Sequence, residues 1–176
     1  HRSACYLFNG NMASGKTLLL NILTKSNSKY KGKIEFEGEN LNRISKSKYL
    51  SEIMYVKQDF KPPYFKTVKT YIESLVNKSG KKKNSEKIIR DIVKIMDFKY
   101  IINAKMRDLT PGQLRWVDMA AKIASFPKVL FIDEIELHLS MVKIKNLCKV
   151  LYRKVNYDGI TIIATSQNKE FFDNLT

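Results

Sequence analysis

The 176-residue sequence predicts an α/β fold, with a mostly parallel sheet, helices on both of its faces and a helical insert in the middle of the chain. Three observations predict this fold. Short apolar runs of the strand type recur along the chain. Stretches with helical periodicity separate these runs, which is typical of a parallel sheet covered on both faces. Residues 61–125 hold no strong strand pattern and are therefore expected to form the insert.

The first sixty residues contain three expected strands and one helix. Residues 4–8 form an apolar run rich in aromatics, typical of a buried strand, and residues 18–23 read as the apolar start of a helix. Residues 33–37 alternate polar and apolar side chains between two glycines, which indicates a short, half-exposed strand. Residues 53–56 form another apolar run, and the two prolines at 62 and 63 close it into a loop.

The remaining elements are mostly helical. From residue 68 to about residue 96 the apolar positions follow a helical period, which a lysine-rich loop interrupts. Pro111 stands where a helix begins, and apolar residues recur at helical spacing after it. Residues 129–132 form a continuous apolar strand, and an apolar helical stripe then runs over residues 144–155. Residues 160–164 form a last buried strand.

Length and composition indicate a single domain. A chain of 176 residues is long enough for one hydrophobic core without disulfides or a structural metal. We expect Cys5 and Cys148 to be small buried apolar residues rather than a bridge or a metal pair. Residues 1–176 are therefore interpreted as one domain, in which residues 1–60 and 126–176 form the core and residues from about 61 to 125 form the helical part.

The net charge of +15 is compatible with a nucleic acid partner, with an anionic membrane surface, or with a generally lysine-rich composition. The lysines are spread along the chain, and their one tight run, at residues 81–83, is interpreted as a loop. Because basic residues do not alternate with aromatic ones, no nucleic acid partner is favoured. The sequence contains no signal peptide and no apolar run long enough to span a bilayer, so a cytoplasmic location is expected.

One motif stands out between the first strand and the first helix. It spells G-x-x-x-x-G-K-T and consists of Gly10, Asn11, Met12, Ala13, Ser14, Gly15, Lys16 and Thr17. Backbone N–H groups of such a loop and of the following helix converge on an anion. Lys16 would reach the β- and γ-phosphates of a nucleotide, and the Thr17 hydroxyl would bind Mg²⁺. The sequence therefore predicts a P-loop NTPase core that binds a nucleoside triphosphate with Mg²⁺.

Three further motifs follow in a defined order. Gln58 follows the strand at 53–56 after one intervening residue, residues 109–113 read Leu-Thr-Pro-Gly-Gln, and the strand at 129–132 is followed by Asp133 and Glu134. In this order and spacing the chain resembles, over nearly its whole length, the ATP-binding subunit of ABC transporters. The resemblance identifies Gln58 with the Q-loop glutamine, residues 109–113 with the signature loop, and the third motif with Walker B.

The resemblance implies roles for these residues in ATP hydrolysis. Asp133, at the carboxyl end of a buried strand, would hold Mg²⁺ through water opposite Thr17. Glu134 would be the general base that orients the attacking water, and Gln58 would touch both Mg²⁺ and that water. Two alternatives stay open: Asp133 and Glu134 could cap the next helix, and Gln58 could be an ordinary loop amide.

The resemblance also implies two kinds of partner. In this family two ATPase subunits sandwich ATP, so Thr110, Gly112 and Gln113 of the signature loop would face the γ-phosphate held by the other subunit, in a homodimer or a heterodimer. An integral membrane permease-type subunit would dock on the helical part near Gln58. The chain would then be a peripheral protein on the cytoplasmic face of the inner (plasma) membrane.

Several positions depart from the family pattern. Ala13 replaces a glycine, Pro111 replaces a signature glycine and removes an N–H, and Ser140 replaces an aspartate. Ser166 stands where the family has a histidine that contacts the γ-phosphate, so we expect Ser166 to be a poor substitute and hydrolysis to be slow. We expect the nearby His138 to be a surface loop residue rather than its replacement.

Two other functions compete with a transport ATPase. The departures favour a scaffold or switch that binds nucleotide without hydrolysing it, and the charge favours a soluble DNA-associated ATPase, although the long heptad arms of that class are missing. Spacing near the signature and over residues 158–165 is closest to small importer, lipoprotein-release and FtsE-type cell-division ATPases. The sequence starts at His1, close to the first strand, and we expect either a trimmed chain or a minimal variant of the family.

Overall fold

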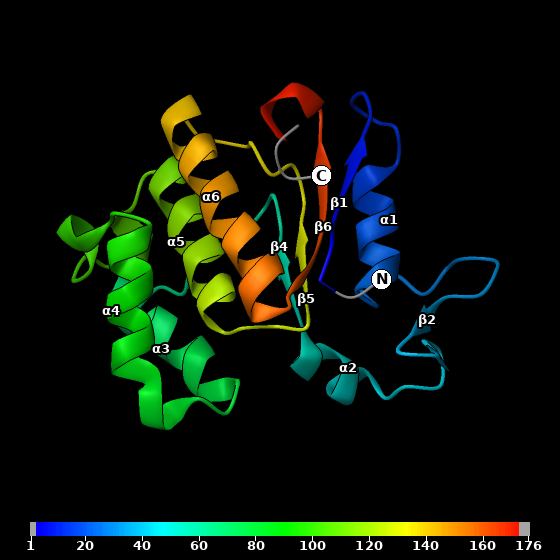
Figure 1. The fold of residues 1–176 in the computed structure, drawn as a ribbon, viewed down its shortest axis with the longest axis horizontal. Helices are drawn as coiled ribbons and strands as arrows, with labels where there is room; N and C mark the ends of the chain where they lie inside the picture. The colour runs from blue at the N-terminus through cyan, green and yellow to red at the C-terminus, as the bar shows by residue number, and fades with distance from the viewer. Residues whose placement is uncertain (1–2, 173–176) are drawn as a thin grey trace.

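A four-stranded parallel sheet forms the centre of the protein, a computed structural model of which describes residues 3–172 (Figure 1). The strands lie side by side in the order β1 (Cys5–Asn9), β6 (Thr161–Ser166), β5 (Val129–Ile132) and β4 (Ile53–Val56). All three neighbouring pairs are parallel. The carboxyl ends of all four strands therefore meet along one edge of the sheet, and the predicted mostly parallel sheet is confirmed.

Helices cover both faces of this sheet (Figure 1). On one face lie α1 (Lys16–Leu23) and α2 (Lys46–Glu52), and on the other α5 (Pro111–Ala124) and α6 (Met141–Asp158). Side chains alternate along β5, so Phe131 joins the apolar cluster on the α1 side while its neighbours join the larger cluster on the α5 side. Burial on both faces explains why this strand reads as an uninterrupted apolar run.

The helical part of the chain packs around α5. Its long helices are α3 (Val68–Lys78) and α4 (Ser85–Ile95), and both contact α5. The Trp116 indole N–H on α5 donates to the Met96 carbonyl oxygen at 2.8 Å and so holds the end of α4. Three short 3₁₀ helices complete this part: η1 (Lys82–Asn84), η2 (Lys99–Ile101) and η3 (Met106–Asp108). The lysine-rich run, predicted to be a loop, lies in the connection between α3 and α4, where Lys82 and Lys83 belong to η1.

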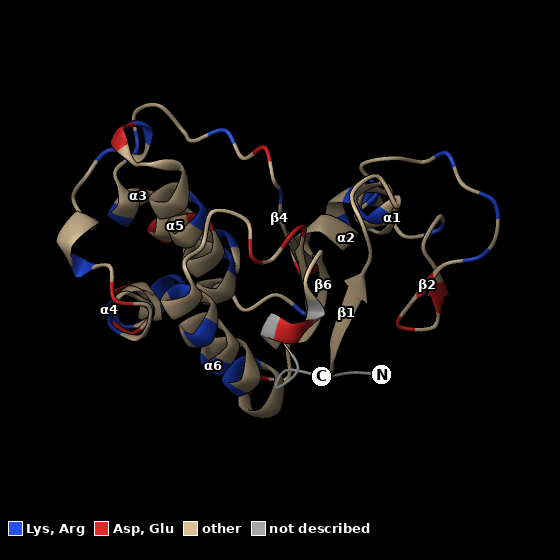
Figure 2. Ribbon diagram, turned by 90° about the horizontal axis from the view of Figure 1, so that it is seen from above, with Lys and Arg blue, Asp and Glu red and all other residues tan. Residues whose placement is uncertain are grey.

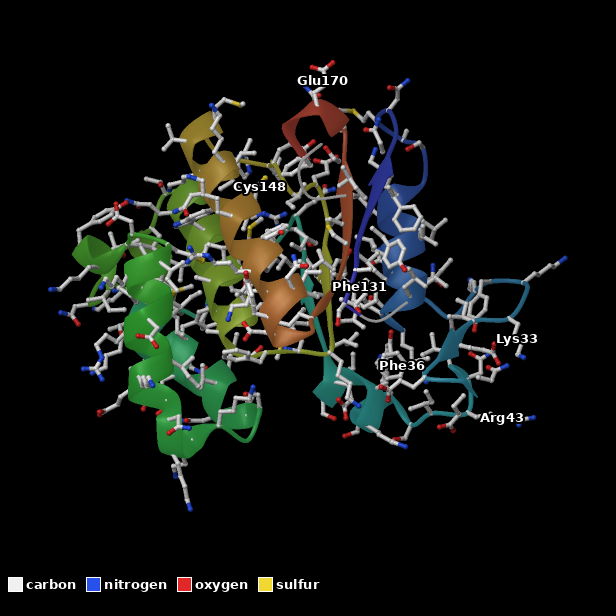
Figure 3. All side chains as sticks on the ribbon, viewed as in Figure 1. Lys33, Phe36, Arg43, Phe131, Cys148 and Glu170 are labelled. Carbon is white, nitrogen blue, oxygen red and sulfur yellow. The ribbon has the colours of Figure 1, made fainter. Side chains whose placement is uncertain are left out.

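The expected strand at residues 33–37 is much shorter in the structure. It is the two-residue strand β2 (Glu35–Phe36), paired antiparallel with β3 (Glu39–Asn40). Glu37 and Gly38 both have positive φ, 53° and 82°, which is the backbone of a tight two-residue hairpin turn. Lys33 Nζ lies 2.8 Å from the carboxylate of Glu35 in β2. Figure 3 shows Arg43 pointing away from the hairpin, whereas Phe36 packs edge-on against Tyr49 of α2 with ring centroids 5.0 Å apart.

Charged residues occur in most parts of the described chain. Figure 2 shows Lys and Arg on most helices and on the loop before β2, not gathered in one patch. Beyond β6 the described chain ends in η4 (Lys169–Phe172), where Glu170 points outward in Figure 3. Within residues 3–172, no helix is both long and apolar enough to span a membrane.

Candidate nucleotide-binding site

The P-loop connects β1 to α1 at the carboxyl edge of the sheet. Gly15 is the N-cap of α1 with φ of 87°, a left-handed conformation that favours glycine, and no side chain caps the helix. The N–H groups of the first turn of α1 are therefore available to an anion. At Gly10 an added Cβ would lie 2.8 Å from the Ser14 hydroxyl oxygen, so a side chain at this position would require Ser14 to move. Ala13 also has positive φ, 63°, which agrees with the glycine that the resemblance expects there.

The Lys16 side chain folds back over this loop. Its Nζ lies 2.5 Å from the carbonyl oxygen of Gly10, 2.8 Å from that of Asn11 and 3.4 Å from Ser14 Oγ. The Asn11 carbonyl also accepts from Ser14 N at 3.3 Å, and Met12 at the tip is 78% exposed. The ammonium group is thus held among the loop carbonyls, beside the open N–H groups of α1. Positive charge and backbone donors converge there, as a phosphate chain requires.

The expected metal ligands come together beside the P-loop. Gln58, which follows β4, donates from Nε2 to Thr17 Oγ1 at 3.3 Å. Asp133, which follows β5, accepts from Thr165 Oγ1 at 2.8 Å with one carboxylate oxygen. Its other oxygen, Oδ2, is buried and has no hydrogen-bond partner among the described residues. A hydroxyl, an amide and a carboxylate with one oxygen to spare are ligands that suit Mg²⁺.

This ligand set is small, which also suits Mg²⁺. In the described part of the chain, no group of three or more His, Cys, Asp or Glu side chains could hold a metal ion. Mg²⁺ is usually bound by one or two protein oxygens together with substrate phosphates and water. The residues present therefore fit a magnesium ion that arrives with a nucleotide.

Glu134, which follows Asp133, has a positive φ, which is uncommon for a residue other than glycine. Its φ is 45°, and its N–H donates to Thr165 Oγ1 at 2.8 Å. Its carboxylate oxygen Oε1 accepts from Gln167 Nε2 at 2.6 Å. The alternative that Asp133 and Glu134 cap the next helix is wrong, because α6 begins seven residues after Glu134 and has Ser140 as its N-cap. No motif in the sequence marks Gln167 as part of the site.

Arg115 on α5 was also not predicted from the sequence, although it joins the loops that follow β4 and β5. It is 3% exposed and donates from Nη1 to the carbonyl oxygen of Lys57 at 2.5 Å. Its Nη2 donates to the carbonyl oxygens of Asp133 and, at 3.0 Å, Glu134. Burial lowers the pKa of Arg115, and nearby carboxylates oppose this shift. One guanidinium thus ties α5 to the loops after β4 and β5.

We expect Arg115→Met to destabilise the fold. The change leaves three inward-facing carbonyl oxygens without this donor, and a buried polar group that loses its partner costs roughly 1–3 kcal/mol. Chemical denaturation should show a lower midpoint for this variant than for Arg90→Met, a matched change at an exposed arginine of α4. Equal midpoints for the two variants would show that Arg115 does not hold the loops.

The signature residues form the start of α5. Thr110 is its N-cap, and the Thr110 hydroxyl accepts from Gln113 N at 3.3 Å while Gln113 Oε1 accepts from Thr110 N at 3.0 Å. Pro111 occupies the first helical turn, as predicted. An added Cβ at Gly112 would lie 2.8 Å from the His138 carbonyl oxygen, so the start of α5 packs closely against the loop that precedes α6. Among the described residues, no hydrogen bond joins the signature to the P-loop of the same chain.

Ser166 approaches the P-loop with its backbone and not with its side chain. Its carbonyl oxygen accepts from Gly10 N at 3.3 Å. Its side chain is fully buried, with Oγ 3.0 Å from Glu136 Oε1 and 3.0 Å from the Asn168 carbonyl oxygen. His138 is exposed in the loop before α6, as expected of a surface histidine.

Comparison with known proteins identifies the family of this chain. The family model described as "ABC transporter" matches residues 1–136. A putative ABC transporter ATP-binding protein of Clostridium tetani is 24% identical over 97% of this chain and 39% of its own length. The spermidine/putrescine import ATP-binding protein PotA of Mycoplasma capricolum is 27% identical over 92% of this chain and 46% of its own. The chain therefore spans less than half the length of these relatives.

Solved structures share the fold. MJ0796, a bacterial ABC transporter cassette solved as a dimer, has a TM-score of 0.83 at 18% identity, over 97% of this chain and 78% of that one. CbiO1 of Clostridium perfringens, part of the ABC transporter complex cbiONQ, has a TM-score of 0.77 at 21% identity, over 97% and 69%. Since the family model covers 136 of the 176 residues, this chain belongs to the ABC transporter family, as one of its ATP-binding domains.

Proposed function

We propose that this chain is the ATPase subunit of a membrane ABC transporter or of an FtsE-like complex, and that it hydrolyses ATP slowly. The observation that supports this proposal best is the contact between Gln58 Nε2 and Thr17 Oγ1 at 3.3 Å. It brings the loop after β4 to the P-loop, and Asp133 ends the neighbouring strand with a spare carboxylate oxygen. These groups surround the place where the terminal phosphates of ATP and its Mg²⁺ would lie.

Each group has a defined task in phosphoryl transfer. Lys16 and the first N–H groups of α1 offset the charge of the phosphates. Thr17, Gln58 and, through water, Asp133 would hold Mg²⁺, which when bound supplies positive charge against the phosphate oxygens. Glu134 orients the attacking water and accepts its proton. The protein contributes mostly positioning and electrostatic stabilisation, which dominate this reaction.

Two partners belong to this proposal. A second ATPase subunit would place Thr110, Gly112 and Gln113 against the γ-phosphate, an arrangement to which the dimeric cassette MJ0796 lends support. An integral membrane permease-type subunit would dock on the helical part near Gln58, and the loop between Gln58 and α3 carries Tyr64 and Phe65, which are 59% and 88% exposed. The names of PotA and CbiO1 describe proteins of transport systems, which favours this partner. The chain would then sit on the cytoplasmic face of the inner (plasma) membrane as a peripheral protein.

A scaffold that binds ATP without cleaving it is the second candidate. It is favoured by the Ser166 side chain, whose hydroxyl lies 3.0 Å from Glu136 Oε1 and is therefore engaged away from a γ-phosphate. In this reading the nucleotide would act as a switch for assembly with the membrane partner.

Slow phosphate release is the expected result that tests the main proposal. Without a side chain that reaches the γ-phosphate from position 166, turnover should be roughly 10–10³-fold below that of a family member with the histidine, by analogy with the loss of one oriented donor. Phosphate release from saturating Mg-ATP, measured beside such a family member, checks this. ATP binding without any phosphate release would favour the scaffold, and turnover at the comparison protein's rate would contradict slow hydrolysis.

A further inference from the structure

The end of β6 carries a side chain that contacts Glu134 directly. Gln167 Nε2 lies 2.6 Å from Glu134 Oε1, and the two residues are 33 positions apart in the sequence. An N–H that donates to a carboxylate forms a short, charge-assisted hydrogen bond, stronger than one between neutral groups. The contact therefore selects one orientation of the Glu134 side chain.

Gln167 is itself anchored by a second carboxylate. Glu136 Oε1 accepts from the Gln167 backbone N–H at 2.7 Å and lies 3.0 Å from Ser166 Oγ. The Ser166 hydroxyl also accepts from Asn168 N at 3.0 Å. The backbone of the turn after β6 is thus fixed on both sides of Gln167, which places its side chain within hydrogen-bond reach of Glu134.

The backbone of Glu134 is fixed independently of this contact. Arg115 binds its carbonyl oxygen, and Thr165 Oγ1 accepts from its N–H. Neither of these bonds restrains the carboxylate, which lies beyond three rotatable bonds. Gln167 supplies that restraint. Ser166, whose hydroxyl is engaged with Glu136, does not.

We propose that Gln167 is a positioning residue that orients Glu134 for ATP hydrolysis, with Glu136 as its anchor. This inference rests on the proposed function of the chain as an ATPase. A catalytic group that is displaced by about 1 Å can lose roughly 10²-fold in rate, so an oriented base has a large effect on turnover. Gln167 donates a hydrogen bond to Glu134, and among the described residues no hydrogen bond joins it to the P-loop, so we expect it to act on the chemical step rather than on nucleotide affinity.

Gln167→Met tests this role, because methionine keeps the length of the side chain and removes its N–H donor. We expect kcat for ATP to fall roughly 10–10²-fold, while KM and the Kd of Mg-ATP measured by calorimetry stay within about two-fold. Gln167→His, which restores an N–H at a comparable distance from the backbone, should recover most of the loss. Asn156→Leu, at an exposed amide of α6 remote from the site, serves as the control and should leave kcat unchanged.

A double-mutant cycle separates positioning from other effects. In a Glu134→Ala background, Gln167→Met should lower kcat no further. Thermal unfolding without nucleotide measures the contact between the two side chains. The decreases in Tm caused by Glu134→Ala and by Gln167→Met should together exceed the decrease in Tm of the double variant. This second readout needs no hydrolysis and requires only folded protein.

Each outcome decides one question. If the wild-type chain turns over ATP and Gln167→Met has the same kcat, the inference is overturned and the proposed function stands. A rise in KM at constant kcat, or additive unfolding shifts, would also overturn it, because Gln167 would then bind nucleotide or not restrain Glu134. If the wild-type chain binds Mg-ATP and releases no phosphate, the ATPase function and this inference fall together.

Discussion

Lys16→Ala is expected to abolish binding of Mg-ATP at millimolar nucleotide. In the folded chain Lys16 Nζ lies among the carbonyl oxygens of the P-loop, beside the uncapped first turn of α1. Phosphate charges held there would lose this cation, and truncation of one partner of such a charge pair costs about 2–5 kcal/mol. Affinity should therefore fall by roughly 10²-fold or more. Calorimetric titration of the variant with Mg-ATP measures this loss.

A matched lysine controls for the loss of one positive charge on a basic protein. Lys145→Ala, at an exposed position of α6, lowers the net charge equally and should bind Mg-ATP like the wild-type chain. If Lys16→Ala keeps its affinity within about two-fold, the P-loop is not the nucleotide site. The two variants together separate a local contact from the long-range field of the protein.

Glu134→Gln should cut ATP turnover by roughly 10²-fold or more and leave Mg-ATP binding intact. Loss of a general base has an effect of this size, whereas the amide keeps the shape of the side chain. Because ATP is bound and not cleaved, this variant should also accumulate an ATP-bound dimer. Steady-state phosphate release measures the first effect, and size-exclusion chromatography with Mg-ATP measures the second.

Glu86→Gln, on the exposed first turn of α4, provides the comparison for this change. It removes the same charge at a distance from the site and should turn over ATP normally. Unchanged turnover in Glu134→Gln would show that Glu134 is not the general base and has a structural role. Lost turnover together with lost ATP binding would mean that the variant damaged the site as a whole.

Local patterns in the sequence were sufficient for the sheet and the P-loop. Strands β4 and β5 are buried on both faces, so each reads as an uninterrupted apolar run with clear ends. The P-loop is a contiguous motif whose glycines and flanking elements are all local, and Pro111 marks the start of α5 because its missing N–H is tolerated there. Such features depend on neighbours in the chain and are visible without a structure.

The parts that escaped prediction depend on long-range contacts. Arg115 binds backbone carbonyl oxygens, which every residue has, so no side-chain pattern identifies its partners. Gln167 and Glu136 act through hydrogen bonds across about thirty residues, which become visible only when β6 lies beside β5. The direction of the Ser166 side chain was not predictable either. Only the backbone of Ser166 contacts the P-loop, whereas its hydroxyl group contacts Glu136.

A single-turnover experiment tests most directly the claim that this site binds and cleaves Mg-ATP. The protein, in excess over γ-labelled ATP with Mg²⁺, is sampled over time for bound nucleotide and for free phosphate. We predict that the label is bound first and then appears slowly as phosphate, and that Glu134→Gln retains the bound label without releasing it. Folded protein that binds no label, or a Glu134→Gln variant that releases phosphate as fast as the wild-type chain, would contradict the account.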